Sequence, residues 1–294
     1  MVRRYELTDQ ERELLAPLIP RAVTGRPRAE DRQVINGMVY KIRTGISWPD
    51  LPERYGPWKT VYTRFRRCAL DGVFPRALQQ IQAHADAAGD IDWLVQIDST
   101  LVRAHQHAAA NRPRRGRHQQ EEPDDHALGG LTTKIQLACD GKGRPLAILV
   151  TPGQRHDSVC ARPLLERIRV PRTGPGRPRC RPDQVIADKA YSSRGFRAYL
   201  RTRGIANTIP EKTGQRRHRL RRGGYGGRPP GFDWETCRRR NMIERCFNRL
   251  KGFRGIATRY EKTATSYEAF VPEAVCGSGR SVCLSSACGH HRVR

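Results

Sequence analysis

Hydrophobic residues recur at helical spacing through the first part of the chain. The segment 31–45 places an apolar row on one helix face and ends at a glycine. A turn-rich stretch follows, and a second helical pattern covers residues 57–71. Two weaker helical patterns begin near Thr8 and near Phe74. Residues 1–88 are therefore expected to form a small all-α domain.

From residue 91 the hydrophobic spacing changes to that of strands. Residues 91–104, 131–140 and 144–153 have the composition of three strands, and a glycine turn between the last two indicates an antiparallel hairpin. A helix, a strand, a helix, a short strand and a long helix over 236–253 follow. This order predicts an α/β domain with a mixed sheet over residues 89–270, and it resembles the ribonuclease-H-like nuclease fold.

Three segments lack a regular hydrophobic period. Residues 111–130 mix charges and are expected to form a mobile loop. Residues 211–232 are rich in Arg and Gly, and two interpretations stay open: a solvated linker, or a flexible arm that holds phosphates. In the final stretch, 271–294, Pro272 and two glycines are expected to break any helix, which predicts a disordered tail.

The amino-acid composition indicates what kind of partner the chain binds. The chain of 294 residues carries 55 Lys and Arg against 29 Asp and Glu, a formal net charge of +26, and only eight of the basic residues are Lys. Such an excess indicates a polyanionic partner, and the planar Arg side chain pairs bidentately with phosphate and guanine. Nucleic acid is the expected partner, although a ribosomal-type or merely basic protein has the same charge.

The second of the two clear N-terminal helices has a basic face, made of Lys59, Arg64, Arg66 and Arg67. Two helices joined by a turn, the second of them basic, resemble the helix-turn-helix that binds the major groove of double-stranded DNA. An ordinary helical bundle with a solvated basic face remains the alternative, because the turn here is longer than the compact version.

The sequence has no sign of export or of a membrane. The first residues are charged and lack the apolar core of a signal peptide, and no run approaches the roughly 20 apolar residues of a spanning helix. The nine cysteines have no tight repeat, which fits reduced thiols. A protein of the bacterial cytoplasm, acting at the nucleoid and without a membrane partner, is expected.

Two aspartates interrupt otherwise apolar strands. Asp98 lies in VQIDST, and Asp188 lies near the C-terminal end of the strand in QVIADKAY. A carboxylate in such a run costs desolvation energy unless it is paired or binds a metal. At strand ends in an α/β fold, carboxylates face the crevice where ligands bind. For either aspartate alone, a capped loop explains the pattern equally well.

A third carboxylate, Glu244, lies in the long helix near the end of the chain. Helical spacing places it on one face with three candidates for contacts to DNA: Arg240, Asn248 and Lys251. A surface helix with many ion pairs has the same pattern, so Glu244 alone is not specific.

Together the three carboxylates indicate a metal site. Two divalent ions about 4 Å apart need several oxygen ligands, and carboxylates suit Mg²⁺ or Mn²⁺, whereas His and Cys clusters suit zinc. Asp98, Asp188 and Glu244 are therefore the predicted catalytic residues and metal ligands. Weaker candidates, for which solvent-facing or loop-capping roles fit at least as well, are His105, His107, His156, Asp140 and Asp157.

The motifs around these residues resemble those of bacterial insertion-sequence transposases of the DDE type, in the large superfamily with a helical N-terminal DNA-binding domain. LVQIDSTLVRAHQH is similar to the first-Asp motif, VIADKAYSSRGFR to the second-Asp motif and RRRNMIERCFNRLKGFRGIATRYEK to the Glu motif. TPGQRHDS is similar to the segment after the third strand. The family pattern of Tyr, Arg, Glu and Lys maps onto Cys237, Arg240, Glu244 and Lys251, so Cys237 stands where Tyr is usual.

The resemblance implies a transposase that uses two Mg²⁺ or Mn²⁺ ions. A dimer or larger assembly would pair the inverted-repeat ends, hydrolysis would expose 3′-hydroxyls, and these would attack a target strand. Arg240 and Lys251 would contact phosphates beside the cleaved bond. Two alternatives stay open: a metal-dependent nuclease of the same fold, or an inactive DNA-binding relic or regulator, since Cys237 and the tail depart from the family pattern.

Overall fold

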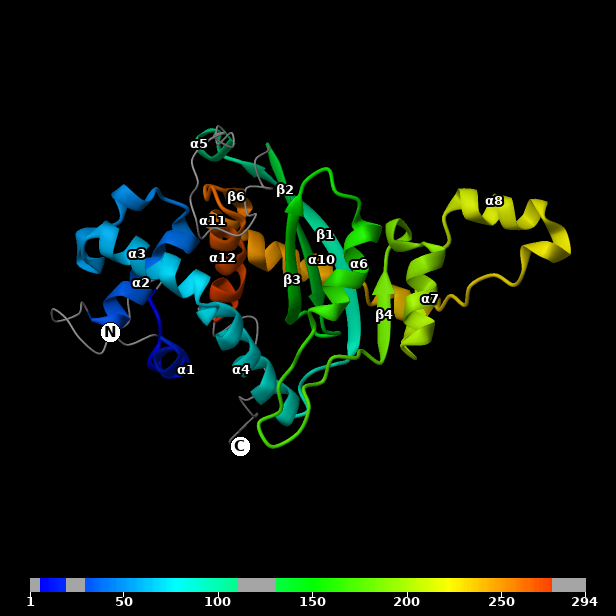
Figure 1. The fold of residues 1–294 in the computed structure, drawn as a ribbon, viewed down its shortest axis with the longest axis horizontal. Helices are drawn as coiled ribbons and strands as arrows, with labels where there is room; N and C mark the ends of the chain where they lie inside the picture. The colour runs from blue at the N-terminus through cyan, green and yellow to red at the C-terminus, as the bar shows by residue number, and fades with distance from the viewer. Residues whose placement is uncertain (1–5, 20–29, 110–130, 277–294) are drawn as a thin grey trace, which may run out of the picture.

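Four helices form the N-terminal part of the computed structural model, which describes residues 6–19, 30–109 and 131–276 (Figure 1). They are α1 (Asp9–Leu15), α2 (Asp31–Thr44), α3 (Trp58–Leu70) and α4 (Val73–Ala87), with 3-10 turns at Ala16–Leu18, Trp48–Asp50 and Glu53–Tyr55. After α2, Gly45 adopts a left-handed conformation (φ 69°) and donates its N–H to the Lys41 carbonyl, a C-cap that glycine forms without strain. The expected all-α N-terminal part is confirmed.

A mixed sheet forms the centre of the molecule. Its strands lie in the order β3–β2–β1–β4–β5, and the short β6 pairs with β1. β1 runs antiparallel to β2 and parallel to β4, β4 is parallel to β5, and β2 and β3 form the expected hairpin. The strands are β1 Leu94–Ala104, β2 Thr132–Cys139, β3 Pro145–Pro152, β4 Gln184–Ala187, β5 Ala206–Thr208 and β6 Thr258–Arg259. The mixed-sheet α/β plan is therefore confirmed.

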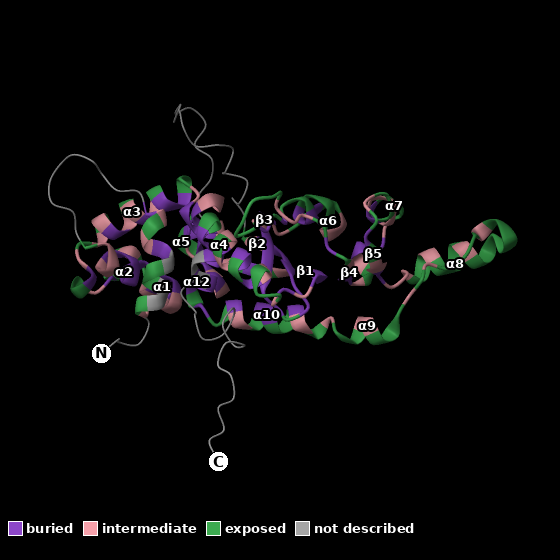
Figure 2. Cartoon of the chain, turned by 90° about the horizontal axis from the view of Figure 1, so that it is seen from below, coloured by how far each residue is buried: buried purple, intermediate pink, exposed green. Residues whose placement is uncertain are grey.

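Different helices cover the two faces of the sheet, so that its strands are mostly buried (Figure 2). One face, which includes Ile97, packs against α6 and α7. The other, which includes Val102, packs against α10 and α12. Because successive residues of a strand alternate between faces, Asp98 lies on the same face as Val102. These helices are α6 (Asp157–Glu166), α7 (Arg194–Thr202), α10 (Asn241–Lys251) and α12 (Ala264–Cys276).

The last helix, α12, corrects the prediction of an irregular tail from residue 271. It continues through Pro272 to Cys276, and Phe270 and Val271 are fully buried in it. A proline inside a helix costs roughly 3 kcal/mol, but burying several large apolar side chains yields more than that. The remainder of the expected tail, 277–294, lies outside the described residues.

The same helix joins the two expected domains. Phe270 packs against Phe65 of α3, with ring centroids 5.1 Å apart, and one continuous cluster of buried residues extends from α2, α3 and α4 to α12, α10 and the sheet. Figure 1 shows α12 between the N-terminal helices and the strands. The N-terminal helices therefore share their core with the rest of the chain.

The basic segment 211–232 is more regular than expected. It begins with α8 (Thr213–Arg221) and the 3-10 turn Gly223–Gly226, which project from the body and are exposed (Figures 1 and 2). Arg and Gln have good helix propensity, which explains a helix without an apolar period. The other expected loop, 111–130, lies wholly outside the described residues.

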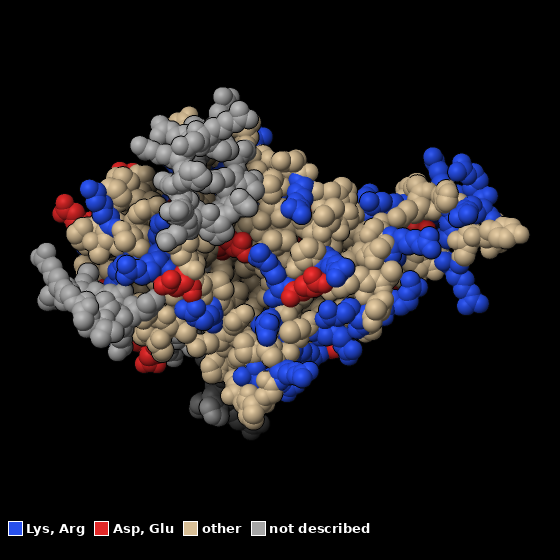
Figure 3. Space-filling model, in the orientation of Figure 1, with Lys and Arg blue, Asp and Glu red and all other residues tan. Residues whose placement is uncertain are grey.

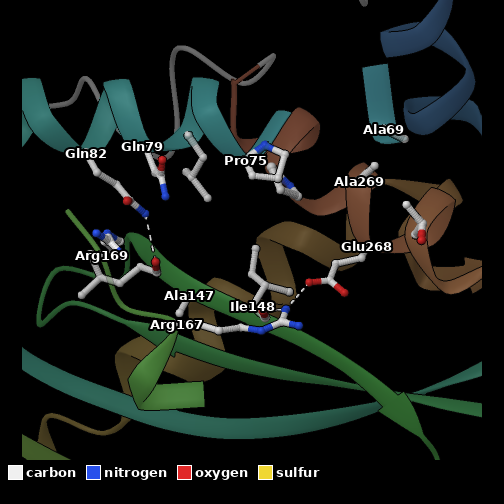
Figure 4. Close-up of a pocket in the computed structure, with 14 residues that line it drawn as sticks. Ala69, Pro75, Gln79, Gln82, Ala147, Ile148, Arg167, Arg169, Glu268 and Ala269 are labelled. Atoms are coloured by element: carbon white, nitrogen blue, oxygen red, sulfur yellow. Dashed lines mark hydrogen bonds and ion pairs between the residues drawn. The ribbon is translucent and has the colours of Figure 1, made fainter. Parts of the chain in front are cut away.

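A cavity of about 340 Å³ lies between α4, α12 and the edge strand β3 (Figure 4). The side-chain amide of Gln82 donates to the carbonyls of Pro145 (2.9 Å) and Leu146 (3.1 Å), and Arg167 donates to the carbonyl of Ile148 (2.8 Å). These side chains occupy the outer carbonyls of β3, which protects the sheet edge from pairing with another chain.

Among the described residues, no helix has the length and apolar character needed to cross a membrane.

Candidate active site

Asp98 and Asp188 lie side by side at one point of the sheet. In the parallel pairing of β1 with β4 the last paired residues are Ile97 and Ala187, and the next residue on each side is an aspartate. Asp98 lies inside β1, which continues to Ala104 beside β2 and does not end here as expected, whereas Asp188 directly follows β4. Strands about 4.8 Å apart therefore carry the two carboxylates at the same level, on the face covered by α10. Asp188 also accepts the N–H of Ala190 over 2.7 Å, which fixes the start of the next turn.

α10 presents Glu244 at this point of the sheet. The backbone N–H of Ile243 donates to Oε1 of Gln96 over 3.1 Å, and Gln96 is fully buried. Gln96 lies two positions before Asp98 and on the same face of β1, so the first turn of α10 is fixed close to Asp98. The neighbouring Glu244 keeps 55% of its side chain exposed, which leaves it free to move.

Arg240 lies between two of the carboxylates. Its Nη1 is 4.0 Å from Oδ2 of Asp98, and its Nη2 is 3.8 Å from Oε1 of Glu244. The single helix expected over 236–253 is divided here into α9 (Trp234–Arg238) and α10, and Arg240 is the N-cap residue of α10. The break places a positive charge where the two carboxylates approach each other.

The electrostatics of Asp98 reflect this crowding. Burial is the main cause that raises the pKa of Asp98 to about 6, and the charges of Asp188 and Glu244 raise it further. The N–H of Ser99, which donates to Asp98 over 2.8 Å, and the guanidinium of Arg240 act in the opposite direction. Asp188 and Glu244 thus lie close enough to Asp98 for their negative charges to act on it, as in a cation-binding cluster.

The donor set fits a divalent cation in its chemistry. All three side chains offer carboxylate oxygens, the ligands that Mg²⁺ and Mn²⁺ prefer, and the position of Arg240 shows that a positive charge is accommodated between two of them. Among the described residues, no three His, Cys, Asp or Glu side chains lie close enough to hold one ion as they stand.

A second polar network lies behind the aspartates, on the α6 face of the sheet. Oδ1 of Asp157, at the start of α6, accepts from Ser99 Oγ (2.8 Å), Lys134 Nζ (3.0 Å) and Gln136 Nε2 (3.1 Å). Burial raises the pKa of Asp157, but these hydrogen bonds outweigh it and hold the pKa below its ordinary value. The hydroxyl of the buried Tyr191 donates to Oε1 of Gln136 over 3.3 Å.

This network is the part of the site that sequence reasoning missed. Ser99 directly follows Asp98 in β1, and Tyr191 ends the turn that Asp188 caps, so the network fixes the backbone beside both aspartates. Asp157 was expected to cap a loop. The alternation of β1 provides the missed signal, because it turns Ser99 toward the helix that begins at Asp157.

The residues predicted to contact DNA lie on two separate helices. Asn248 and Lys251 are exposed on α10, one and two turns after Glu244, whereas Lys59 and Arg67 are exposed on α3. Arg66 is half-buried on the same helix. Arg64 differs from the others, because its side chain is only 11% exposed and pairs with Asp31 of α2. Its contact joins α2 to α3, which is a structural role.

The weaker candidates take local structural roles. Asp140 is a turn cap, as expected, since it accepts the N–H of Arg144 over 2.7 Å in the β2–β3 hairpin. His156 is the N-cap of α6, and His105 stacks on Tyr260 with ring centroids 4.8 Å apart. None of these contacts joins them to the three carboxylates.

Comparison with known proteins gives the family. A family model described as "Transposase DDE domain" matches residues 91–271, and one described as "Putative transposase of IS4/5 family" matches residues 7–78.

Two relatives and a solved structure illustrate the likeness. The chain is 34% identical over 141 residues to a Brucella ovis protein named "Putative transposase for insertion sequence element IS6501", covering 48% of this chain and 92% of that one. It is 30% identical over 154 residues to the Burkholderia cepacia protein named for IS402, covering 52% and 64%. The piggyBac transposase synaptic complex with hairpin DNA is a distant structural match, with a TM-score of 0.44 and 10% identity over 94% of this chain and 74% of that one.

The DDE-domain family model covers more than half of the chain and spans all the strands of the sheet and all three carboxylates, so the chain belongs to the family of DDE-domain transposases.

Proposed function

We propose that this chain is a transposase whose active site is formed by Asp98, Asp188 and Glu244. It binds the terminal inverted repeats of a mobile element, cleaves the DNA at each end and joins the 3′-hydroxyls to target DNA. One observation carries the assignment. Two aspartates stand next to each other on parallel strands, and a helix anchored to one of those strands carries a glutamate beside them.

The three carboxylates are proposed to hold two Mg²⁺ or Mn²⁺ ions. Such ions supply an activated oxygen nucleophile and stabilise the leaving oxygen in an in-line displacement at phosphorus. The chain's own contribution is positioning: β1 and β4 fix the two aspartates, and Gln96 fixes the helix that carries Glu244. Arg240, Asn248 and Lys251 are proposed to contact phosphates next to the cleaved bond.

The remaining partner assignments follow from charge. The N-terminal part, residues 1–88, is proposed to bind the element ends through the basic side chains of α3 that remain exposed or half-exposed: Lys59, Arg66 and Arg67. A homodimer or larger assembly on double-stranded DNA is proposed, since two ends must be held together. The proposed place of action is the bacterial cytoplasm, at the nucleoid.

A strand-transfer assay with Mg²⁺ tests the assignment. Glu244→Gln keeps the shape of an exposed side chain but removes a ligand charge, so we expect cleavage and joining to fall by at least about 100-fold while DNA binding persists. Glu235→Gln, the same change at an exposed position of α9, serves as the matched control and should keep full activity.

The assay also separates the two other functions. Cleavage without joining would assign the chain as a metal-dependent nuclease. Binding with neither reaction would assign it as a DNA-binding regulator or an inactive relic. Equal activity in Glu244→Gln and the wild type would overturn the proposed site.

A further inference from the structure

A wide groove of about 1210 Å³ separates α7 from the projecting segment that begins with α8. In Figure 1 this segment extends away from the sheet, and in Figure 3 Lys and Arg side chains crowd that end of the molecule. β5 and the residues after the 3-10 turn complete the lining. The lining contains one acidic residue, Glu211, and six arginines, so the groove is strongly positive.

Most of the arginines that line the groove come from α7 and from the end of α8. α7 contributes Arg194, Arg197 and Arg201, which recur at i, i+3 and i+7 and therefore share one helix face. α8 contributes His218 and Arg219, and Arg222 follows at the end of the same face. The other arginines of α8, at positions 216, 217 and 221, do not line the groove.

Two of the six arginines hold the groove together. Arg197 donates to Oδ1 of Asn207 (3.2 Å) and to the carbonyl of Ile209 (2.7 Å), and Arg219 makes two hydrogen bonds with Glu211 (3.2 and 3.1 Å). These two guanidinium groups are therefore engaged in contacts within the protein that fix the walls of the groove.

The other four arginines are free to bind a ligand. Arg194, Arg201, Arg222 and Arg228 are exposed, and their side chains make no hydrogen bond or ion pair with any part of the chain that the structure describes. Four unpaired guanidinium groups around one groove repel one another, and an anionic ligand would relieve that repulsion.

The groove is joined firmly to the site at Asp188. Nε2 of Gln215, in α8, donates to the carbonyl of Ser192 (2.7 Å), and Ser192 Oγ donates to Oε1 of Gln215 (2.8 Å). Ser192 is buried and directly follows the turn that Asp188 caps. A strand held in the groove is therefore held at a fixed position relative to the carboxylates.

We propose that this groove is a second DNA-binding site, which holds the phosphodiester backbone of DNA next to the segment cleaved at the carboxylates. The four free arginines lie at separate points of the lining: two on α7, one directly after α8 and one beyond the 3-10 turn. Such spaced charges suit a polymer of phosphates better than a single small anion. The lining includes no Phe, Tyr or Trp on which bases could stack, so the contacts are with the backbone and are independent of sequence. The inference rests on the proposed function, which supplies the DNA.

The salt dependence of DNA binding tests the groove directly. The triple variant Arg194→Gln, Arg201→Gln and Arg222→Gln is compared with wild type on a 30-base-pair duplex, in EDTA so that no cleavage occurs. We expect the slope of log K against log salt to fall by about 3, because each lost phosphate contact lowers it by about 1. Affinity should fall on the order of 10- to 100-fold, equally for two unrelated sequences.

The matched control is the triple variant Arg216→Gln, Arg217→Gln and Arg221→Gln. It removes the same charge from α8 outside the groove, so its slope should change by less than about 1. An equal loss in both triple variants would mean a diffuse charge effect and would overturn the proposal, as would an unchanged slope in the groove variant. Because binding is measured without metal, failure of the proposed chemistry leaves this result unaffected.

Discussion

At the residue scale, the buried Asp98 is under electrostatic strain, since its pKa of about 6 lies well above the ordinary 3.8. A carboxyl with a raised pKa binds its proton more tightly in the folded state than in the unfolded state. Its contribution to stability is therefore present below about pH 4 and is lost as pH rises through about 6. At neutral pH without metal, the charged Asp98 destabilises the fold.

Asp98→Asn should consequently stabilise the metal-free protein. In EDTA at pH 7 we expect a gain of roughly 1–3 kcal/mol in unfolding free energy, shrinking toward zero near pH 4. Urea unfolding at several pH values measures it. Adding Mg²⁺ should stabilise the wild type and leave the variant unchanged. A variant less stable than wild type at pH 7 in EDTA would contradict the burial of this charge.

At the scale of the element, the contact between Gln96 and the backbone of Ile243 decides where α10 stands. Arg240, at the N-cap of this helix, makes no side-chain cap of its own, so a side chain from β1 supplies the partner instead. The position of Glu244 is thus set by a residue of the sheet. Helical periodicity predicts the exposed face that carries Glu244 but not the strand that anchors the helix.

Gln96→Met should separate positioning from stability. The substitution keeps the volume of the side chain but removes the hydrogen-bond acceptor. We therefore expect the free energy of unfolding to fall by less than about 2 kcal/mol, and the rate constant of strand transfer to fall by at least about tenfold. Cys246→Ala, a buried change on the same helix, is the control that loses comparable stability with little loss of rate. Equal rate losses in both variants would indicate that stability alone is responsible.

At the scale of the whole molecule, the N-terminal helices and the catalytic part share one core through α12. Lys41 of α2 adds a buried ion pair with Glu261, at 3.7 Å between Nζ and Oε1, and both side chains are almost inaccessible. Burial lowers the pKa of Lys41 and raises that of Glu261. Separating the two parts would expose this pair and the aromatic residues around it.

Phe270→Ala should therefore weaken the whole protein. We expect the free energy of unfolding to fall by about 3–5 kcal/mol. In single-tryptophan variants, the fluorescence of Trp48 in the N-terminal part and that of Trp93 beside β1 should report the same shift of the unfolding transition. Leu220→Ala, at an exposed position of α8, should leave both transitions unchanged. If the unfolding transition followed at Trp48 shifted while the one followed at Trp93 did not, the two parts would unfold independently and the shared core would be contradicted.

The local pattern of the sequence was sufficient to predict much of the secondary structure. Helical spacing predicted α2 and α3, apolar runs bounded by turn residues predicted the strands, and the rarity of a carboxylate in such a run singled out Asp98 and Asp188 as candidates. These features depend on neighbours in the chain, so the sequence carries them directly. The charge of the chain likewise predicted a nucleic-acid partner without any structure.

Tertiary structure alone decided how these pieces meet. It set the two aspartates level on parallel neighbours, connected Asp157 to Ser99 behind them, and brought six arginines from α7, α8 and the segment after it around one groove. It also kept α12 helical through Pro272, because burial outweighed a local preference for a break. Each of these results depends on contacts between residues far apart in the chain, which no local period encodes.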